Sequence, residues 1–461
     1  MRAELTLENC VQRIEGPLIF LERKAELGLN ARVEVLGRDG RGRIGRIAAV
    51  DDRTFVIEVL ESTLGLGVRD TRIRVWNEPL LFGVGPGMLG RTFDSIGQTT
   101  DGGAPIAAAR RMRIDGLAIN PAARALPRDF IETGVSAIDL MNSLVRGQKL
   151  PLFSGAGLPH DRLATQIVLQ ARLRHEGASF AVVFVGMGIS HDTADTFRNA
   201  MASSGALEHT AMFLNLADEP SAQRLLTPRY ALTAAEYLAF VEGRHVLVVM
   251  TDMTNYCEAL REVSASHGEL PSRKGYPGYM YSDLASLYER AGCISGLPGT
   301  LTQVPILTMP ADDISHPIAD LTGYITEGQI VLDRELDRRG IYPPVSLLPS
   351  LSRLMNAGIG AGFTHADHPA LANQLFACYA RATHVRVLAS VMGEESLPEV
   401  DRRFLVFGRA LEERLVNQEG RRTLEESMQL GWELLSGLPA TELTRLSQQQ
   451  IDRYLGGQSH A

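Results

Sequence analysis

Cysteine is scarce in this chain, and the four that are present are scattered. No two of them form a C-x-x-C pair, and no histidine stands beside them at the spacing of a metal ligand. This pattern argues against a zinc site and against a disulfide framework, so no metal is predicted. We interpret the cysteines as reduced structural thiols. They are Cys10, Cys257, Cys293 and Cys378.

Long apolar runs are also absent. No stretch reaches the roughly 18 residues that a membrane-spanning helix needs, and the start of the chain, MRAELTLENC, lacks the basic-then-apolar order of a signal peptide. We therefore predict a cytoplasmic protein with no direct membrane insertion. The net charge of −8 gives no support to a nucleic-acid binder held by phosphate contacts.

Lysine is rare although basic residues are not, because only three of the 46 Lys and Arg residues are lysines. A working P-loop needs backbone N–H groups around the phosphates, a lysine for the outer phosphates and a Ser or Thr hydroxyl for magnesium. None of the three lysines follows a glycine-rich loop that opens a helix, so no segment supplies that cation. They are Lys24, Lys149 and Lys274.

The scaffold of a P-loop is nevertheless present at residues 150–161. An apolar run enters a turn that contains Gly155 and Gly157 and leaves into a helix predicted over residues 161–176. On spacing alone, the two glycines fit equally well a plain turn in a fold that never bound nucleotide. The stretch therefore predicts the shape of a phosphate loop and leaves its chemistry open.

The chemistry of this loop is altered over the last three positions of the motif. When G-x-x-x-x-G-K-[ST] is aligned from Ser154, Pro159 replaces the last glycine, His160 replaces the lysine and Asp161 replaces the hydroxyl. Proline has no N–H to donate, and the aspartate would place a carboxylate where phosphates should lie. The sequence therefore predicts a degenerate P-loop.

A second nucleotide motif is indicated by Asp252, which follows the apolar strand 246–250. In the Walker B motif such a carboxylate holds magnesium or its water, but many parallel strands end in an aspartate that only caps the next helix. Residues 186–192, which follow the strand 180–185, contain no glutamate to polarise an attacking water. A second part of a hydrolytic site is therefore missing.

The periodicity of the chain predicts a multidomain α/β fold with three parts. Residues 1–76 read as short strands of a small β-barrel, residues 77–361 as alternating strands and helices around a parallel sheet, and residues 362–461 as a helical bundle. Strands are expected at 10–14, 32–36, 43–50, 54–60, 71–75, 180–185, 211–216, 246–250 and 304–309. Helices are expected at 369–391, 401–417, 423–436 and 441–455.

Several local sequences resemble the B subunit (beta chain) of the V/A-type ATPase, a non-catalytic head subunit of a rotary motor. An example is PSLSRLM at residues 349–355, and together the similar runs are spread over nearly the whole chain. The resemblance implies a RecA-like central domain of the P-loop NTPase type and explains the degenerate loop, since that family member is regulatory. The other runs are residues 131–139, 147–160, 251–261, 275–284, 312–317 and 323–329.

The resemblance also implies function and partners. The B subunits alternate with catalytic A subunits in an A3B3 hexamer, beside central shaft and peripheral stalk subunits, in a complex peripheral to the membrane that couples ATP synthesis or hydrolysis to hydrogen ion transport. It implies that ATP or ADP binds with Mg at the interface with the A subunit. There Arg353 would act in trans as an arginine finger, with Tyr324 and Ser352 lining the same nucleotide pocket.

Two alternatives stay open at this point. One is a hexamer subunit that is purely structural, in which Arg353 forms an ordinary interface ion pair. The other is an autonomous hexameric ATPase, such as an export ATPase or a Rho-like helicase. That class needs the lysine that this loop lacks, and a Rho-like enzyme also needs an aromatic and basic RNA-binding face.

Overall fold

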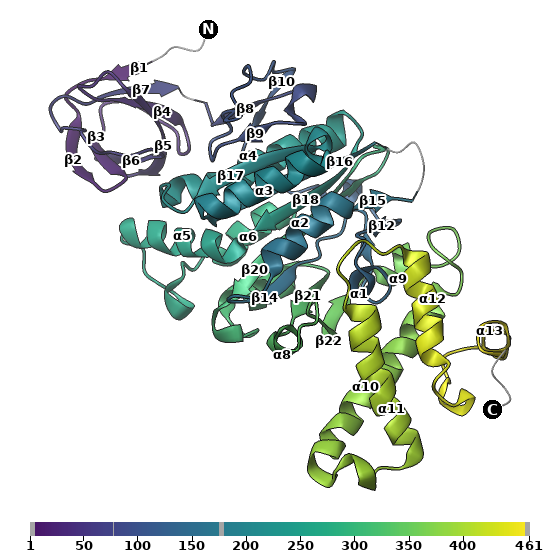
Figure 1. The fold of residues 1–461 in the computed structure, drawn as a ribbon. Helices are drawn as coiled ribbons and strands as arrows, with labels where there is room; N and C mark the ends of the chain where they lie inside the picture. Colours follow the sequence, from purple (N-terminus) through teal and green to yellow (C-terminus); the bar gives the residue numbers. More distant parts are fainter. Residues whose placement is uncertain (1–4, 77, 175–178, 457–461) are drawn as a thin grey trace. The chain divides into compact units, whose positions relative to one another are not determined.

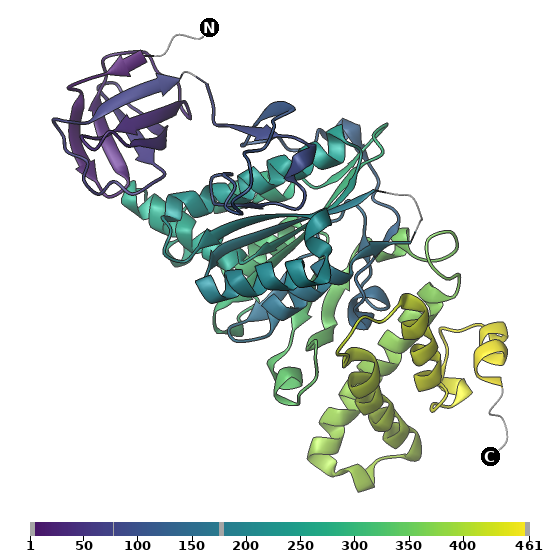
Figure 2. The ribbon, with the colours of Figure 1, turned by 45° about the horizontal axis from the view of Figure 1, so that its top comes forward.

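The computed structural model describes residues 5–76, 78–174 and 179–456. The chain divides into two compact units, each built from separate stretches of sequence. The first unit comprises Met1–Ala118, Ala181–Glu242 and Asp252–Arg290, and the second comprises Ile119–Phe180, Gly243–Thr251 and Ala291–Ala461. Figures 1 and 2 trace the chain from its purple N-terminal strands to its yellow C-terminal helices.

The N-terminal part of the first unit is an antiparallel sheet of seven strands in the order β1-β7-β4-β5-β6-β3-β2. The sheet curls around a core that includes Val33, Phe55 and Ile57, all fully buried (Figure 1). Alternation of buried and partly exposed residues along the strands produces this one-sided core. The strands are β1 (Leu5–Leu7), β2 (Val11–Glu15), β3 (Leu18–Glu22), β4 (Arg32–Leu36), β5 (Gly42–Val50), β6 (Thr54–Val59) and β7 (Arg72–Trp76).

Two of these strands, β1 and β3, were not expected from the sequence. β1 has only three residues, and β3 is the nearly continuous apolar run Leu-Ile-Phe-Leu, which lacks the alternation that identifies a half-buried strand. The five predicted strands are present within one or two residues of their expected ends. The predicted small β-barrel is thus a curled sheet.

The rest of the first unit contains parallel strands with helices, and a separate antiparallel pair of β8 (Leu81–Val84) and β10 (Arg110–Arg113). β17 (Thr210–Leu216) pairs in parallel with both β16 (Phe180–Ile189) and β9 (Thr92–Phe93). Both β16 and β17 are buried along nearly their whole length, as expected for parallel strands covered on both faces. The accompanying helices are α3 (His191–Ser204), α4 (Ser221–Glu236), α5 (Met253–Ser266) and α6 (Met280–Tyr288).

The second unit contains a sheet in the order β22-β21-β14-β20-β18. β14 is parallel to β20 and β21, β18 is parallel to β20, and the outermost strand β22 is antiparallel to β21. Because β22 runs against β14, the carboxyl ends of these two strands lie at opposite edges of one sheet. The strands are β14 (Leu152–Gly155), β18 (His245–Thr251), β20 (Thr300–Met309), β21 (Gly328–Leu332) and β22 (Val345–Ser352).

The helix after the glycine turn is shorter than predicted. α2 runs from His160 to Gln170, because Ala171 leaves the helical conformation and β15 (Arg172–Leu173) pairs with β12 (Phe130–Glu132). Strand pairing across the chain has overridden the local helical pattern. The remainder of the prediction reaches into residues 175–178, which lie outside the described residues.

The C-terminal helices follow the predictions except the last. α10 (His368–Met392), α11 (Glu399–Ala410) with its π-helical extension Leu411–Val416, and α12 (Leu424–Leu435) occupy the expected ranges. The helix expected at 441–455 is instead a short turn followed by α13 (Gln448–Tyr454), because Ser447 and Gln450 form a capping box that starts a new helix.

The predicted α/β multidomain class is confirmed, whereas the domain boundaries after residues 76 and 361 stay predictions. Among the helices of the described ranges, none has both the length and the apolarity to cross a membrane.

Candidate functional site

The glycine loop joins β14 to α2, as the P-loop pattern predicts. Gly157 has a positive φ of 80°, with nothing near the position of an added Cβ atom, so glycine is favoured there by backbone conformation. Pro159 stands at the N-cap of α2, and no side chain caps this helix. The loop has the turn geometry of a phosphate loop at the amino end of a helix, where anions are favoured.

His160 and Asp161 are tied to other residues of the same unit. Nδ1 of His160 lies 3.0 Å from Oγ of Ser154, across the turn. The hydroxyl of Thr251 donates to a carboxylate oxygen of Asp161 at 3.3 Å, and Nε2 of His160 lies 3.7 Å from the same carboxylate. The imidazole at the lysine position thus connects the two ends of the loop.

An ion pair that the sequence analysis missed lies against this loop. Arg334 donates to both oxygens of Asp312, at 2.7 and 2.9 Å, and to the carbonyl of Ala156 at 2.9 Å. The hydrogen bonds from Arg334 hold the pKa of the Asp312 carboxyl below its usual value, so this carboxylate is charged at neutral pH. We call Asp312 and Arg334 the loop clasp.

The loop clasp explains why residue 155 is glycine. An added Cβ atom on Gly155 would lie 2.1 Å from Oδ1 of Asp312 and 2.9 Å from a nitrogen of Arg334. Ala311 and Asp312 both have left-handed backbone conformations, which are costly for residues other than glycine. Asp312 belongs to one of the runs that resemble the V/A family, but no local pattern indicates its contact with the loop.

Asp252 caps α5. Its carboxylate accepts a hydrogen bond of 2.7 Å from the backbone N–H of Thr254, and the side chain is buried. This is the helix-capping alternative that the sequence left open. The Walker B role of Asp252 stays a prediction. Within the described ranges, no group of three or more His, Cys, Asp or Glu side chains is arranged to hold a metal ion.

Arg353 lies directly beyond the end of β22 and is exposed. Its backbone N–H donates to the carbonyl of Glu327 at 3.0 Å, and Nη1 donates to the carbonyl of Thr326 at 3.3 Å. Tyr324 lies two residues before Thr326, at the end of α7 (Pro317–Ile325), and is 77% exposed. The structure therefore brings Arg353 and the Tyr324 segment together at one exposed edge of the sheet.

Ser352, the third predicted interface residue, points inward. Its hydroxyl donates to the carbonyl of Ser143 at 2.9 Å and accepts from the side-chain amide of Gln148 at 2.9 Å, and the residue is buried. Ser352 therefore anchors the end of β22, while the residue after it reaches solvent. Its role in lining a nucleotide pocket stays a prediction.

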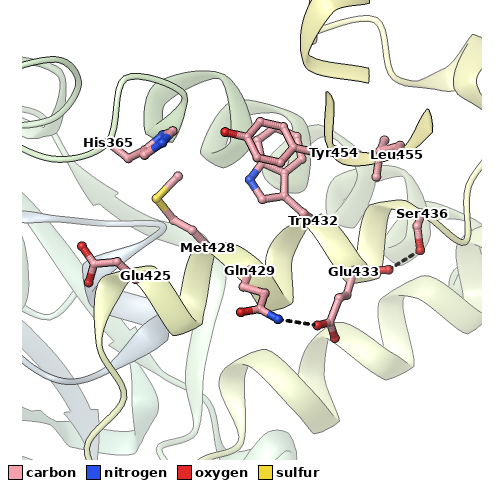
Figure 3. Close-up of a pocket in the computed structure, with 9 residues that line it drawn as sticks. All are labelled: His365, Glu425, Met428, Gln429, Trp432, Glu433, Ser436, Tyr454 and Leu455. Carbon is pink, nitrogen blue, oxygen red and sulfur yellow. Dashed lines mark hydrogen bonds between the residues drawn. The ribbon is translucent and has the colours of Figure 1, made fainter. Parts of the chain in front are cut away.

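A separate pocket of about 500 Å³ lies in the helical part of the second unit (Figure 3). Trp432 and Tyr454 stack within it, with ring centroids 4.2 Å apart, and Met428 and His365 also line it. None of the residues predicted for the loop or for the nucleotide interface lines this pocket. It is therefore not part of the site described above.

Comparisons with known proteins identify the class. The nucleotide-binding domain of the ATP synthase alpha/beta family matches residues 134–352, and the C-terminal domain of V and A type ATP synthase matches residues 357–455. The first match contains the glycine loop, the loop clasp and Ser352. The second covers the C-terminal helices.

Individual relatives match over nearly the full length. The V-type ATP synthase beta chain of Halothermothrix orenii is 54% identical over 97% of both chains, and the V-type ATP synthase beta chain 2 of Treponema pallidum is 52% identical over 96% of this chain and 92% of its own. The solved structure of the ATP synthase subunit NeqB from Nanoarcheaum equitans is 36% identical, with a TM-score of 0.73, and covers 92% of this chain and 100% of its own. The chain belongs to the ATP synthase alpha/beta family, as a beta (B) subunit of the V/A type.

Proposed function

We propose that this chain is the non-catalytic, regulatory B subunit of a proton-translocating V/A-type ATP synthase or ATPase. It alternates with the catalytic A subunit in an A3B3 head and contacts the central shaft and peripheral stalk subunits. The complex is cytoplasmic and peripheral to the membrane. It forms ATP from ADP with a proton gradient, or runs in reverse.

This proposal rests on one observation: side chains of the chain itself contact the glycine loop where a catalytic P-loop would hold phosphate. In a catalytic P-loop a lysine reaches the outer phosphates, whereas His160 here is bound to Ser154. The charged carboxylate of Asp312 lies against Gly155, where it opposes the approach of phosphate oxygens. The residues present do not fit ATP with Mg at this chain's own loop, and so no catalytic step is assigned to it.

The exposed guanidinium of Arg353 supports a catalytic contribution across the interface. ATP or ADP with Mg binds mainly to the A subunit, and Arg353 of this chain would offset the charge that builds on the transferred phosphoryl group. Arginine suits this task because its planar fork donates two parallel hydrogen bonds to phosphate oxygens. Tyr324 would contact the same nucleotide, whereas Asp252 would act as a helix cap.

The test is ATPase activity of this chain alone and after mixing with the A subunit of the same organism, with the mass of each sample measured by size exclusion. We expect no turnover by the isolated chain and strong turnover in a complex with the mass of six subunits. Turnover by the isolated chain would favour the autonomous export-type or Rho-like ATPase. If the hexamer keeps its ATPase activity when Arg353 is replaced, the alternative of a purely structural subunit is favoured.

A further inference from the structure

The end of the β21–β22 ladder holds Arg353 against Glu327. Gly328 pairs with Ser352, so Glu327 and Arg353 are the next residues on the two strands, and the N–H of Arg353 donates to the carbonyl of Glu327. The strands approach so closely that a Cβ atom on Gly328 would lie 2.0 Å from the carbonyl oxygen of Leu351. The backbone of Arg353 is therefore placed by the residue opposite to it.

Glu327 is in turn held by Lys149 through three contacts. Nζ of Lys149 lies 2.7 Å from Oε1 of Glu327, and the N–H of Lys149 donates to Oε2, also at 2.7 Å. The N–H of Glu327 donates to the carbonyl of Lys149 at 3.0 Å. The lysine side chain is only 4% exposed and that of the glutamate 28%, so solvent screens this pair far less than a surface ion pair.

Gln148 ties the same residues together from the other side. Its side-chain amide donates to the carbonyl of Glu327 at 3.1 Å and to the hydroxyl of Ser352 at 2.9 Å. The segment before β14 thus contacts Glu327, directly before β21, and Ser352, at the end of β22 next to Arg353. Burying an ammonium group is costly unless it is paired. Lys149 is one of only three lysines in the chain, and its buried position indicates a specific role for its pair with Glu327.

We propose that the Lys149–Glu327 pair positions Arg353 for the neighbouring subunit's nucleotide site. This inference rests on the proposed function. Lys149 holds the Glu327 carboxylate away from the guanidinium of Arg353. That guanidinium donates to the carbonyl of Thr326, the residue before Glu327. Without the ammonium of Lys149, the carboxylate keeps only the backbone N–H of residue 149 as its partner there. It then turns onto Arg353 and neutralises it, so that the guanidinium no longer meets the phosphoryl group. Lys149 and Glu327 are positioning residues and touch no substrate.

The experiment measures ATP hydrolysis by the complex of this chain with its A subunit. Lys149→Met should lower kcat about 100-fold, the size expected when a catalytic group is displaced by about 1 Å, with KM for ATP nearly unchanged. The double variant Lys149→Met/Glu327→Gln has no carboxylate to capture Arg353 and should recover most of the lost kcat. A purely structural role predicts no such recovery.

A third comparison tests whether the effect passes through Arg353. In the Arg353→Ala background, Lys149→Met should cause no further loss of kcat, because the group that it positions is already absent. Additive losses, or a double variant no better than Lys149→Met, would overturn the inference. If Lys149→Met does not assemble, Lys149→Gln, which also leaves the carboxylate charge unbalanced, is measured by the same criteria.

The trans-acting role of Arg353 and the positioning role of Lys149 can fail separately. If Arg353→Ala retains near-normal turnover in the assembled complex, the trans-acting role fails and the positioning role fails with it. If Arg353→Ala is nearly inactive but Lys149→Met is not impaired, only the positioning role fails. Size exclusion on every variant confirms that the complexes compared are assembled.

Discussion

The sheet of the second unit differs between its two edges, meaning the edge at the carboxyl end of β14 and the edge at the carboxyl end of β22, in how exposed their functional side chains are. At the carboxyl end of β14, polar side chains near the loop are engaged within the chain: His160 with Ser154, and Arg334 with Asp312. At the other edge, Arg353 is exposed, and its backbone N–H donates to the carbonyl of Glu327. The edge with the P-loop pattern is thus closed by side chains of the chain itself, and the edge without that pattern carries the exposed guanidinium of Arg353.

The largest expected effect is at the exposed edge. Arg353→Ala should lower kcat of the assembled complex by about 10³–10⁵, the range for arginine fingers in phosphoryl transfer. Arg353→Lys should recover only part of this, because an ammonium lacks the planar fork. Steady-state ATPase assays check it, with Arg402→Ala as a control for removal of an exposed arginine of the same unit. Turnover within a few-fold of the unmodified complex would show that the exposed edge makes no contribution to catalysis.

Glycine substitutions should affect the two edges unequally. Gly328→Ala is expected to cost about 2–5 kcal/mol of unfolding free energy, because it combines a φ of 136° with the close approach to Leu351. Gly157→Ala meets no atom within 4 Å and should cost only about 1–2 kcal/mol of backbone strain. Denaturant unfolding of the isolated chain measures both. Equal costs would show that the β21–β22 end is no more tightly built than the loop.

The buried residue His368 should make the folding stability of the second unit sensitive to acid. His368 is fully buried between the carbonyl of Leu140 and the hydroxyl of Thr364, and burial lowers its pKa to about 4. The unfolded chain binds a proton near pH 6.5 and the folded chain does not, so stability is lost as pH falls from about 7 towards 4. Between about pH 7.5 and 5 the loss is about 2 kcal/mol.

The measurement compares the unmodified chain with His368→Gln, which removes this titration. The comparison is needed because burial raises the pKa of Asp139 to about 7, so that protonation of Asp139 adds stability over the same pH range. The difference in unfolding free energy between the two chains should shrink by about 2 kcal/mol on acidification. A difference that stays constant with pH would contradict the neutral state of His368.

The smallest effect is expected from rebuilding the closed edge. The triple variant Pro159→Gly/His160→Lys/Asp161→Thr restores the last three positions of the motif but leaves the Asp312 carboxylate against the loop. Adding Asp312→Asn should tighten ATP binding by the isolated chain about tenfold, or about 1.4 kcal/mol, because a like charge is removed from the phosphate position. Titration calorimetry gives both dissociation constants. Equal values would mean that the loop clasp does not oppose phosphate.

Local sequence patterns predicted most of the helices and strands, because the spacing of apolar residues within a short window indicates each type of element. Strands such as β4 and β5, in which buried and partly exposed residues alternate, were predicted, whereas β3 was missed because it is a nearly continuous apolar run. The helix after the loop was expected to extend past its observed end at Gln170. There the next residues pair with β12, which is a contact that no local window contains.

The sequence by itself determined the chemistry of the loop: no lysine, no hydroxyl at the magnesium position, and a proline where an N–H is needed. Similarity over the whole chain also pointed to the family. The tertiary structure alone decided what surrounds these residues. Arg334 reaches the loop from 178 positions away, and Glu327 reaches Lys149 across the same separation. Both contacts exist because β21 and β14 lie side by side in the sheet, an adjacency that side-chain periodicity does not encode.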